Sequence, residues 1–279
     1  MNNQHTHQTF RQRLLGLLHN RSRFLLFNYI VACSLLALLV GGCTVGRDAS
    51  TGATTYTSGT PSNQDTTSGN SVSQSFTVQG TPTLAINNDA GSITSARGSN
   101  GGVAVTATKY SSDGNTSDMT VSLRQAGDTI YITGRLPQQS SRGDKHIDFA
   151  ITTPTTTNVQ VNTKAGLVQM QGISGQMAVD ADAADIHMQQ GTLQGNSTLQ
   201  TTAGAITFQG SLDPHSTDNF NSTAGAISLT LPSDASFELK ATASVGTINN
   251  EFGSDVVGSP SYAQVTVTTL VGRIIIHKA

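Results

Sequence analysis

The sequence predicts an all-β protein, a parallel β-helix or solenoid-like stack of short strands with an irregular β cap at its N-terminal end. Three observations predict it. A four-residue motif recurs at a nearly constant step, and stretches of alternating apolar and polar residues flank its copies. Charged residues make up only 11% of the 279 residues, and there is no Trp. This composition is typical of secreted or surface β proteins rather than cytosolic enzymes.

The motif is a small residue, a glycine, any residue and an aliphatic residue. Its copies are AGSI (90–93), AGLV (165–168), AADI (183–186), AGAI (203–206), AGAI (224–227), VGTI (245–248) and VGRI (271–274). From Val168 onward the aliphatic positions are separated by 18, 20, 21, 21 and 26 residues. A period near 20 residues indicates stacked coils, each contributing one supersecondary unit.

Each part of the motif has a physical reason in such a stack. The aliphatic residues should line up as a core ladder when like strands pair: Ile93, Val168, Ile186, Ile206, Ile227, Ile248 and Ile274. The glycines should occupy turns where a Cβ would clash or φ is positive: Gly91, Gly166, Gly204, Gly225, Gly246 and Gly272. Ala184 takes the glycine position in one copy, so a positive φ is not strictly required there.

Further strands are expected before the glycines and throughout the first half of the domain. The strands before the glycines are predicted at 158–163, 176–181, 196–201, 237–242 and 263–268. The less regular region 75–157 shows six more alternating stretches, and we expect it to cap the stack. Open solenoid ends expose unpaired strand edges, which is why a cap is needed.

The N-terminal region predicts export and anchoring. Four arginines precede the apolar run 24–42, which ends LLVGGC. This ending resembles the lipobox of bacterial lipoproteins, and the resemblance implies that Cys43 is acylated and the preceding peptide removed. The alternative is an uncleaved signal anchor, because 19 largely apolar residues can just span a bilayer. We therefore divide the chain into a signal or anchor segment (1–43), a disordered Ser/Thr/Gly-rich linker (44–74) and a β-strand-repeat domain (75–279).

The recurring small–Gly–x–Ile turn, the basic leader and the β-rich body together resemble the bacterial putative-adhesin family of β-strand-repeat proteins, a domain family of unknown function. The resemblance covers residues 75–279. In that family the turn is often Ser-Gly-Asp-Ile, whereas here Ala replaces Ser in most copies and only Asp185 keeps the acid. The resemblance implies a β-helix-like fold and a location in the cell envelope.

The sequence offers few candidates for chemistry. Both cysteines, Cys33 and Cys43, lie in the N-terminal segment, so the main domain has no thiol. The weak ligand candidates are Asp180, Asp182 and Asp185, of which the first two share a strand face. They could bind Ca²⁺ or a glycan or do acid–base work. No Lys or Arg lies within ten residues of them, so we predict no catalytic residue, no metal and no cofactor.

These observations favour a membrane-tethered, extracytoplasmic, non-catalytic binding or adhesion module at the cell surface. The expected partners are the membrane, reached through the lipid or the apolar segment, and an envelope polysaccharide or a surface protein. Residues 44–279 carry 11 Lys and Arg against 17 Asp and Glu, which argues against nucleic acid. The alternatives are a carbohydrate-active enzyme on a β-helix scaffold and an envelope-stress sensing accessory. The oligomeric state stays open.

Overall fold

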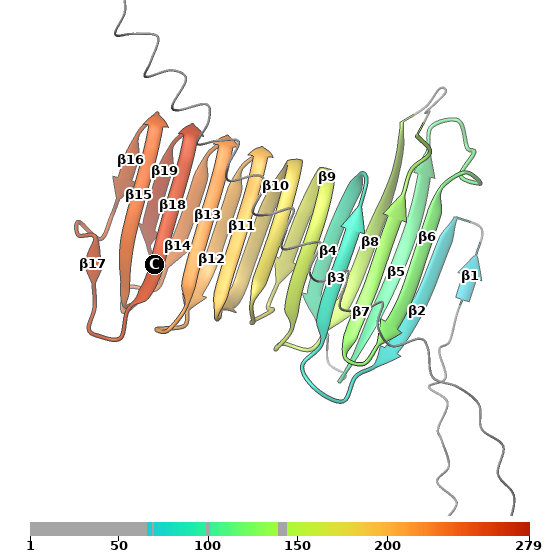
Figure 1. Cartoon of the computed structure of the whole chain (residues 1–279), viewed down its shortest axis with the longest axis horizontal. Helices are drawn as coiled ribbons and strands as arrows, with labels where there is room; N and C mark the ends of the chain where they lie inside the picture. The colour runs from blue at the N-terminus through green and yellow to red at the C-terminus, as the bar shows by residue number, and fades with distance from the viewer. Residues whose placement is uncertain (1–65, 69, 99–100, 139–143) are drawn as a thin grey trace, which may run out of the picture. The chain divides into compact units, whose positions relative to one another are not determined.

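The computed structural model describes residues 66–68, 70–98, 101–138 and 144–279, all within the compact unit Gly59–Ala279. These residues form strands and connecting loops without a helix, so the all-β prediction is confirmed (Figure 1). None of the described segments is a helix able to cross a membrane. The strands are β1 (Thr66–Ser68), β2 (Ser71–Thr77), β3 (Thr83–Asn88), β4 (Gly91–Arg97), β5 (Gly102–Ser111), β6 (Thr120–Ala126), β7 (Thr129–Arg135), β8 (Lys145–Thr153), β9 (Asn158–Gln171), β10 (Met177–Leu193), β11 (Asn196–Ala203), β12 (Ile206–Leu212), β13 (Thr217–Ala224), β14 (Ile227–Leu231), β15 (Phe237–Val245), β16 (Ile248–Asn250), β17 (Val256–Val257), β18 (Ala263–Val271) and β19 (Ile274–Lys278).

Most strands pair in parallel in two long ladders. Ladder 1 contains the strands before the motif glycines, in the spatial order β7, β3, the first half of β9, the first half of β10, β11, β13, β18 and β15. Ladder 2 contains the strands after the glycines, in the order β8, β4, the second halves of β9 and β10, β12, β14, β19 and β16. One strand from each ladder makes a rung, and this stacking is compatible with the predicted solenoid.

The spatial order of the rungs differs from the sequence at both ends. Strands β3 and β4 lie between the β7–β8 rung and β9, although β7 and β8 come later in the chain. At the other end, the last strands β18 and β19 insert between β13–β14 and β15–β16. At the first end the motif copies still stack in sequence order, because β3–β4 lies next to β9 and the β7–β8 rung carries no copy. The expected stacking of successive copies therefore fails only for the last copy, whose rung β18–β19 is inserted before β15–β16.

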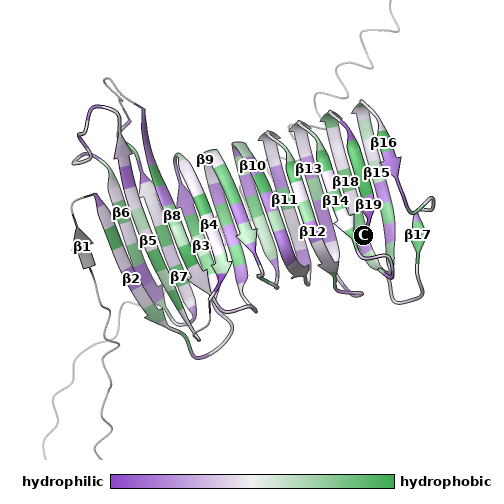
Figure 2. Ribbon diagram, turned by 180° about the vertical axis from the view of Figure 1, so that it is seen from behind, coloured by the Kyte–Doolittle hydropathy of each residue, from purple (hydrophilic) through white to green (hydrophobic). Residues whose placement is uncertain are grey.

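Alternate residues of both ladders point inward and form one apolar core. Ile206 and Phe208 of β12, for example, are fully buried, whereas Thr207 between them is half-buried on the outer face. The rings of Phe208 in ladder 2 and Phe220 in ladder 1 lie 5.7 Å apart, centroid to centroid, so the two ladders pack on each other. Figure 2 shows the same alternation as bands of hydrophobic and hydrophilic residues along the strands.

Antiparallel strands extend the stack at the N-terminal end. In ladder 1, β6 pairs with β7, and in ladder 2, β5 pairs with β8 and is followed by β2 and β1. These strands form the irregular β region that the sequence predicted there. Ser71–Gln74, which were assigned to the linker from the sequence, pair with Val105–Thr108 of β5.

The motif glycines stack on one another at the corner between the ladders. A Cβ on Gly225 would collide with the carbonyl oxygen of Gly204, and one on Gly272 would collide with that of Gly225. Gly225 lacks the positive φ of the other five motif glycines, so the close approach of the backbones is the shared reason for glycine. At Ala184 the strand β10 runs on without a break, and its side chain is buried.

Candidate functional site

The structure aligns the predicted core ladder. Ile93 pairs with Val168, and the register continues through Ile186, Ile206, Ile227 and Ile274, all of them at most 1% exposed. Ile248 is the exception, and its assignment to the core requires correction. It pairs with Ile274 but is 46% exposed, because insertion of the last rung leaves β16 at the edge of ladder 2.

The three aspartates singled out in the sequence do not form one cluster. Asp185 lies at the start of the ladder 2 half of β10, and its Oδ1 accepts a hydrogen bond from the backbone N–H of Ala205, at 2.7 Å. Asp148 makes the same contact with the N–H of Ser92, also at 2.7 Å. Asp185 therefore holds the corner of the neighbouring rung. Asp180 and Asp182 lie on the exposed outer face of ladder 1.

Asp182 belongs to a row of charged residues that are far apart in the sequence and were not recognised from it. Residues two positions before the glycine position of the motif, which is Ala184 in one copy, lie beside one another on neighbouring rungs. Thr163 pairs with Ala181 and Ala165 pairs with Ala183, so Lys164 and Asp182 occupy neighbouring rungs. The charged row consists of Arg135, Asp89, Lys164 and Asp182, with alternating sign. Although no Lys or Arg lies near Asp182 in the sequence, the fold places Lys164 on the rung next to it.

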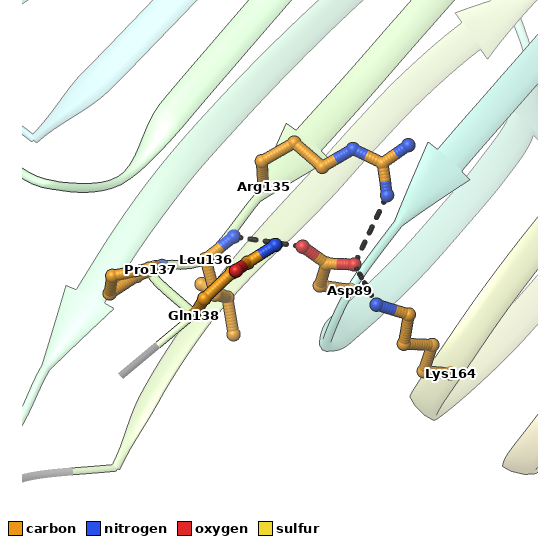
Figure 3. Close-up of a pocket in the computed structure, with 6 residues that line it drawn as sticks. All are labelled: Asp89, Arg135, Leu136, Pro137, Gln138 and Lys164. Atoms are coloured by element: carbon orange, nitrogen blue, oxygen red, sulfur yellow. Dashed lines mark hydrogen bonds and ion pairs between the residues drawn. The ribbon is translucent and has the colours of Figure 1, made fainter. Parts of the chain in front are cut away.

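The centre of the charged row is Asp89, which is held by three neighbours (Figure 3). Its Oδ1 lies 2.7 Å from Lys164 Nζ and 3.1 Å from Arg135 Nη1, and its Oδ2 accepts a hydrogen bond from the backbone N–H of Leu136 at 3.0 Å. Partial burial acts to raise the pKa of Asp89, but these hydrogen bonds and the charge of Lys164 together hold the pKa below its usual value. The carboxylate thus stays ionised.

A pocket of about 690 Å³ opens over this carboxylate. Its other lining residues are Leu136, Pro137 and Gln138, which follow β7. The side chains of Arg135 and Lys164 are about half and two-thirds exposed, so N–H groups that do not contact Asp89 can reach solvent. The pocket therefore offers hydrogen-bond donors to a polar ligand.

Beside the charged row runs a second outer-face column that is almost wholly uncharged. Its members stand four positions before the glycine position of each motif copy, which is Ala184 in one copy, and backbone pairing places them on successive rungs. We call it the polar column: Asn87, Asn162, Asp180, Gln200, Asn221, Thr268 and Thr242. With neighbouring strands about 4.8 Å apart, its six steps span on the order of 29 Å. It presents a flat series of amide and hydroxyl groups at a constant spacing.

Sequence reasoning missed the residues of the pocket, although a signal for them exists. Asp89, Lys164 and Asp182 are far apart in the chain but share one position in the repeat, two residues before the corner. Aligning the copies on the glycine would have placed them in one row. Arg135 could not be found in this way, because β7 carries no copy of the motif.

One buried acid lies outside this face. Asp218 of β13 points into the core and is fully buried; Ser216 Oγ donates a hydrogen bond to its Oδ2 at 2.5 Å, while Oδ1 has no partner. Burial raises the pKa of Asp218 to about 6, and the nearby charge of Asp213 adds to this rise, while the Ser216 hydrogen bond opposes it. The site is closed to ligands, so its effect is on stability.

The described residues contain no group of three His, Cys, Asp or Glu side chains placed to hold a metal ion. Cys43, the predicted lipidation site, lies outside the described residues.

No protein-family model matches the chain, and no curated protein matches it. Several solved structures are similar to it, including the following three. A "putative cell adhesion protein" from Clostridium sporogenes ATCC 15579 has a TM-score of 0.49 and 13% identity over 74% of this chain and 99% of that one. A "putative adhesin" from Bacteroides fragilis NCTC 9343 has a TM-score of 0.43 and 14% identity over 75% and 98%.

A "putative adhesin" from Parabacteroides distasonis ATCC 8503 has a TM-score of 0.31 and 9% identity over 76% of this chain and 98% of that one. At these identities and TM-scores, none of the three structures bears on what this chain binds.

Proposed function

We propose that the chain is a non-catalytic binding or adhesion module of the cell envelope, and that the outer face of ladder 1 is its binding surface. The observation that supports this is the polar column, which repeats amide and hydroxyl groups once per rung. Such a face suits an extended polymer, because many weak hydrogen bonds add up along its length and no single deep pocket is needed.

The ligand class that fits this face best is a polysaccharide of low charge. Sugar hydroxyls both donate and accept hydrogen bonds, and the side chains of Asn, Gln and Thr do the same. The charged row at the N-terminal end of the column adds donors from Arg135 and Lys164, to which a carboxylate or phosphate substituent on the polymer could bind. A surface protein is the other partner class expected from the sequence.

Asp180 and Asp182 lie on this surface, and their surroundings support binding over catalysis. Asp180 is flanked by Asn162 and Gln200, whose side chains carry no charge. Acid–base catalysis by a pair of carboxyl groups needs two different environments, with one of the groups shielded from water. Both carboxyl groups are instead exposed to water.

We further propose that the N-terminal segment tethers this surface to a membrane through a lipid on Cys43. The basis is the basic leader and the LLVGGC ending. Mass spectrometry of the membrane-extracted protein tests it. We expect a chain that begins at an acylated Cys43; an unmodified chain that retains residues 1–42 would instead identify a signal anchor.

The experiment that tests the binding function presents the full chain to a panel of immobilised glycans, peptidoglycan and surface proteins, and scores bound protein and released products. We expect saturable binding to an extended glycan without product. The variant Q200A/N221A, in the polar column, should weaken binding at least tenfold. The matched variant Q189A/Q209A changes two exposed glutamines on the outer face of ladder 2 and should bind as the unmodified chain does.

If both variants lose the same amount of binding affinity, the outer face of ladder 1 is not the binding surface. Product release would overturn the non-catalytic assignment. If the chain binds only the proteins on the panel, its partner is a surface protein and not a polysaccharide.

A further inference from the structure

The C-terminal end of the stack leaves apolar side chains in water. Val245 is 63% exposed and Ile248 is 46% exposed, and both belong to the terminal rung β15–β16. Leu270 and Val271 of the adjacent strand β18 are each about half exposed beside them. In the interior rungs the small residue before the glycine is Ala, as at Ala203 and Ala224, whereas here it is Val. Apolar surface is thus concentrated at this end.

The segment after β16 covers only part of this end. Strand β17 pairs antiparallel with Phe237 and Glu238, and Phe252 packs edge-on against Phe237 with ring centroids 5.1 Å apart. The backbone N–H of Leu239 donates to Asp255 O at 2.7 Å, and within the described residues no strand pairs with this side of β15 beyond that point. By the alternation of a β-strand, the N–H and C=O groups of Ala241 and Ala243 point to the same open side.

The open edge carries none of the features that usually prevent edge pairing. Residues 241–250, ATASVGTINN, contain no charged residue and no proline. Its ends are marked by Lys240 on one side and Glu251 on the other. The opposite end of the stack differs, because ladder 1 ends there in the hairpin strand β6, whose Arg124 lies 3.9 Å above the ring of Tyr131.

We propose that this edge pairs with the same edge of a second copy of the chain, giving a closed dimer with twofold symmetry. Ala243 lies three residues before Gly246 and Asn249 lies three residues after it, so the two positions stand at the same height on the two ladders. A single axis normal to both ladders can therefore pass midway between the two copies of Ala243 and midway between the two copies of Asn249. About that axis β15 pairs antiparallel with β15 of the second copy, and β16 with β16.

This register is self-complementary. Ala241 falls opposite Val245 of the second copy, and Ile248 falls opposite Asn250 of the second copy. Lys240 faces Gly246 and Glu251 faces Thr247 of the second copy, so no like charges oppose each other. Pairing satisfies the free backbone groups of the edge and covers Val245 and Ile248. A head-to-tail contact would instead place β15 against β6 and leave an open chain of copies.

Cysteine cross-linking tests the register, using the full chain with Cys33 and Cys43 replaced by serine. In the proposed dimer Ala243 faces its own counterpart in a hydrogen-bonded antiparallel pair, for which the Cα–Cα distance is about 5.5 Å. That distance lies within the range of about 4.4–6.8 Å that a disulfide requires. We expect A243C to give a disulfide-linked dimer on mild oxidation. The matched variant A241C, whose counterpart lies about four residues away along the strand, should not.

Sedimentation of the full chain in detergent, over a range of concentrations, tests the association itself. We expect a reversible dimer that A243K converts to a monomer, while T268K, with the added charge one rung inside the stack, leaves the dimer intact. Thermal unfolding of both variants checks that they fold. A monomer at every concentration, open chains of increasing length, or equal cross-linking of A241C and A243C would each overturn the proposal.

Discussion

The middle of the stack and its two ends follow different rules. From β9 to β14 the rungs succeed one another in sequence order, and the motif aliphatics Val168, Ile186, Ile206 and Ile227 are completely buried. At the C-terminal end the order is exchanged, and Ile248 is half exposed although it occupies the same place in the motif.

The difference shows that a repeat fixes the register of a rung but not its place in the stack. Register depends on local features: the alternation of side chains and the glycine that allows close backbone contact at the corner. Place depends on the connections. The step between the last two aliphatics is 26 residues instead of 21, and the extra length lies in residues 251–262, which carry the chain back past the edge.

The strongest test of this comparison truncates the same motif residue in the middle and at the end. Ile206→Ala should lower the free energy of unfolding by about 4 kcal/mol, because it leaves a cavity between two packed rungs. Ile248→Ala should cost only about 1 kcal/mol, since nearly half of that side chain is already in water. Denaturant unfolding of both variants, at a concentration too low for association, measures the difference.

Equal costs would mean that Ile248 is covered in solution even at that dilution, and the distinction between middle and end would then fail. Ile274→Ala serves as the control, because Ile274 is fully buried on the inserted rung that adjoins Ile248. Its cost should match that of Ile206→Ala.

Much of the middle could be predicted from the sequence, because there one local pattern decides both pairing and burial. Strand β13 was nevertheless missed. Its inward positions include Asp218 and Ser222 beside Phe220, so the apolar alternation that marks a strand is broken. Its place follows instead from pairing with β11 and β18 on either side.

The candidate surface was only partly predictable. Asp180 and Asp182 were singled out because they are close in sequence, and both lie on the outer face of ladder 1. Their partners come from other rungs: Asn162 and Gln200 beside Asp180, and Lys164 beside Asp182. A search limited to neighbours in the chain cannot find such contacts, since a parallel stack brings together residues about 20 positions apart.

Asp218 allows the inside of the stack to be compared with its outer face. Its carboxyl group is fully buried with a pKa of about 6, raised from 3.8. A raised pKa means that the folded state binds the proton more tightly, so this group lowers stability progressively as the pH rises from about 4 to about 6. Asp218→Asn should therefore raise the free energy of unfolding at pH 7 by as much as about 3 kcal/mol.

The pH profile separates this charge effect from a change in packing. The gain from Asp218→Asn should shrink towards zero below pH 4, where the aspartic acid is neutral in both states. Asp180→Asn, on the outer face, should leave stability within about 0.5 kcal/mol of the unmodified chain. A gain that persists unchanged at pH 3 would show that the amide fits the site better than the acid for reasons other than charge.

Asp89 should respond to pH in the opposite direction. Its pKa is held below 3.8, since the hydrogen bonds and charge of its neighbours outweigh partial burial, so its contribution to stability is present above about pH 4 and is lost as the pH falls through the folded pKa. Asp89→Asn should cost only about 1 kcal/mol at pH 7, because Lys164 and Arg135 extend largely into water. Urea unfolding of the variant at several pH values measures this.

Asp182→Asn is the matched control for this smallest effect. Asp182 lies in the same charged row but has no hydrogen bond or ion pair among the described contacts, so its loss should leave stability unchanged. If both substitutions cost the same, the row would act through its summed charge and not through the contacts of Asp89. Salt separates the two cases further: about 1 M NaCl should remove a summed-charge effect, whereas the hydrogen bond from Leu136 to Asp89 is a short-range contact and should persist.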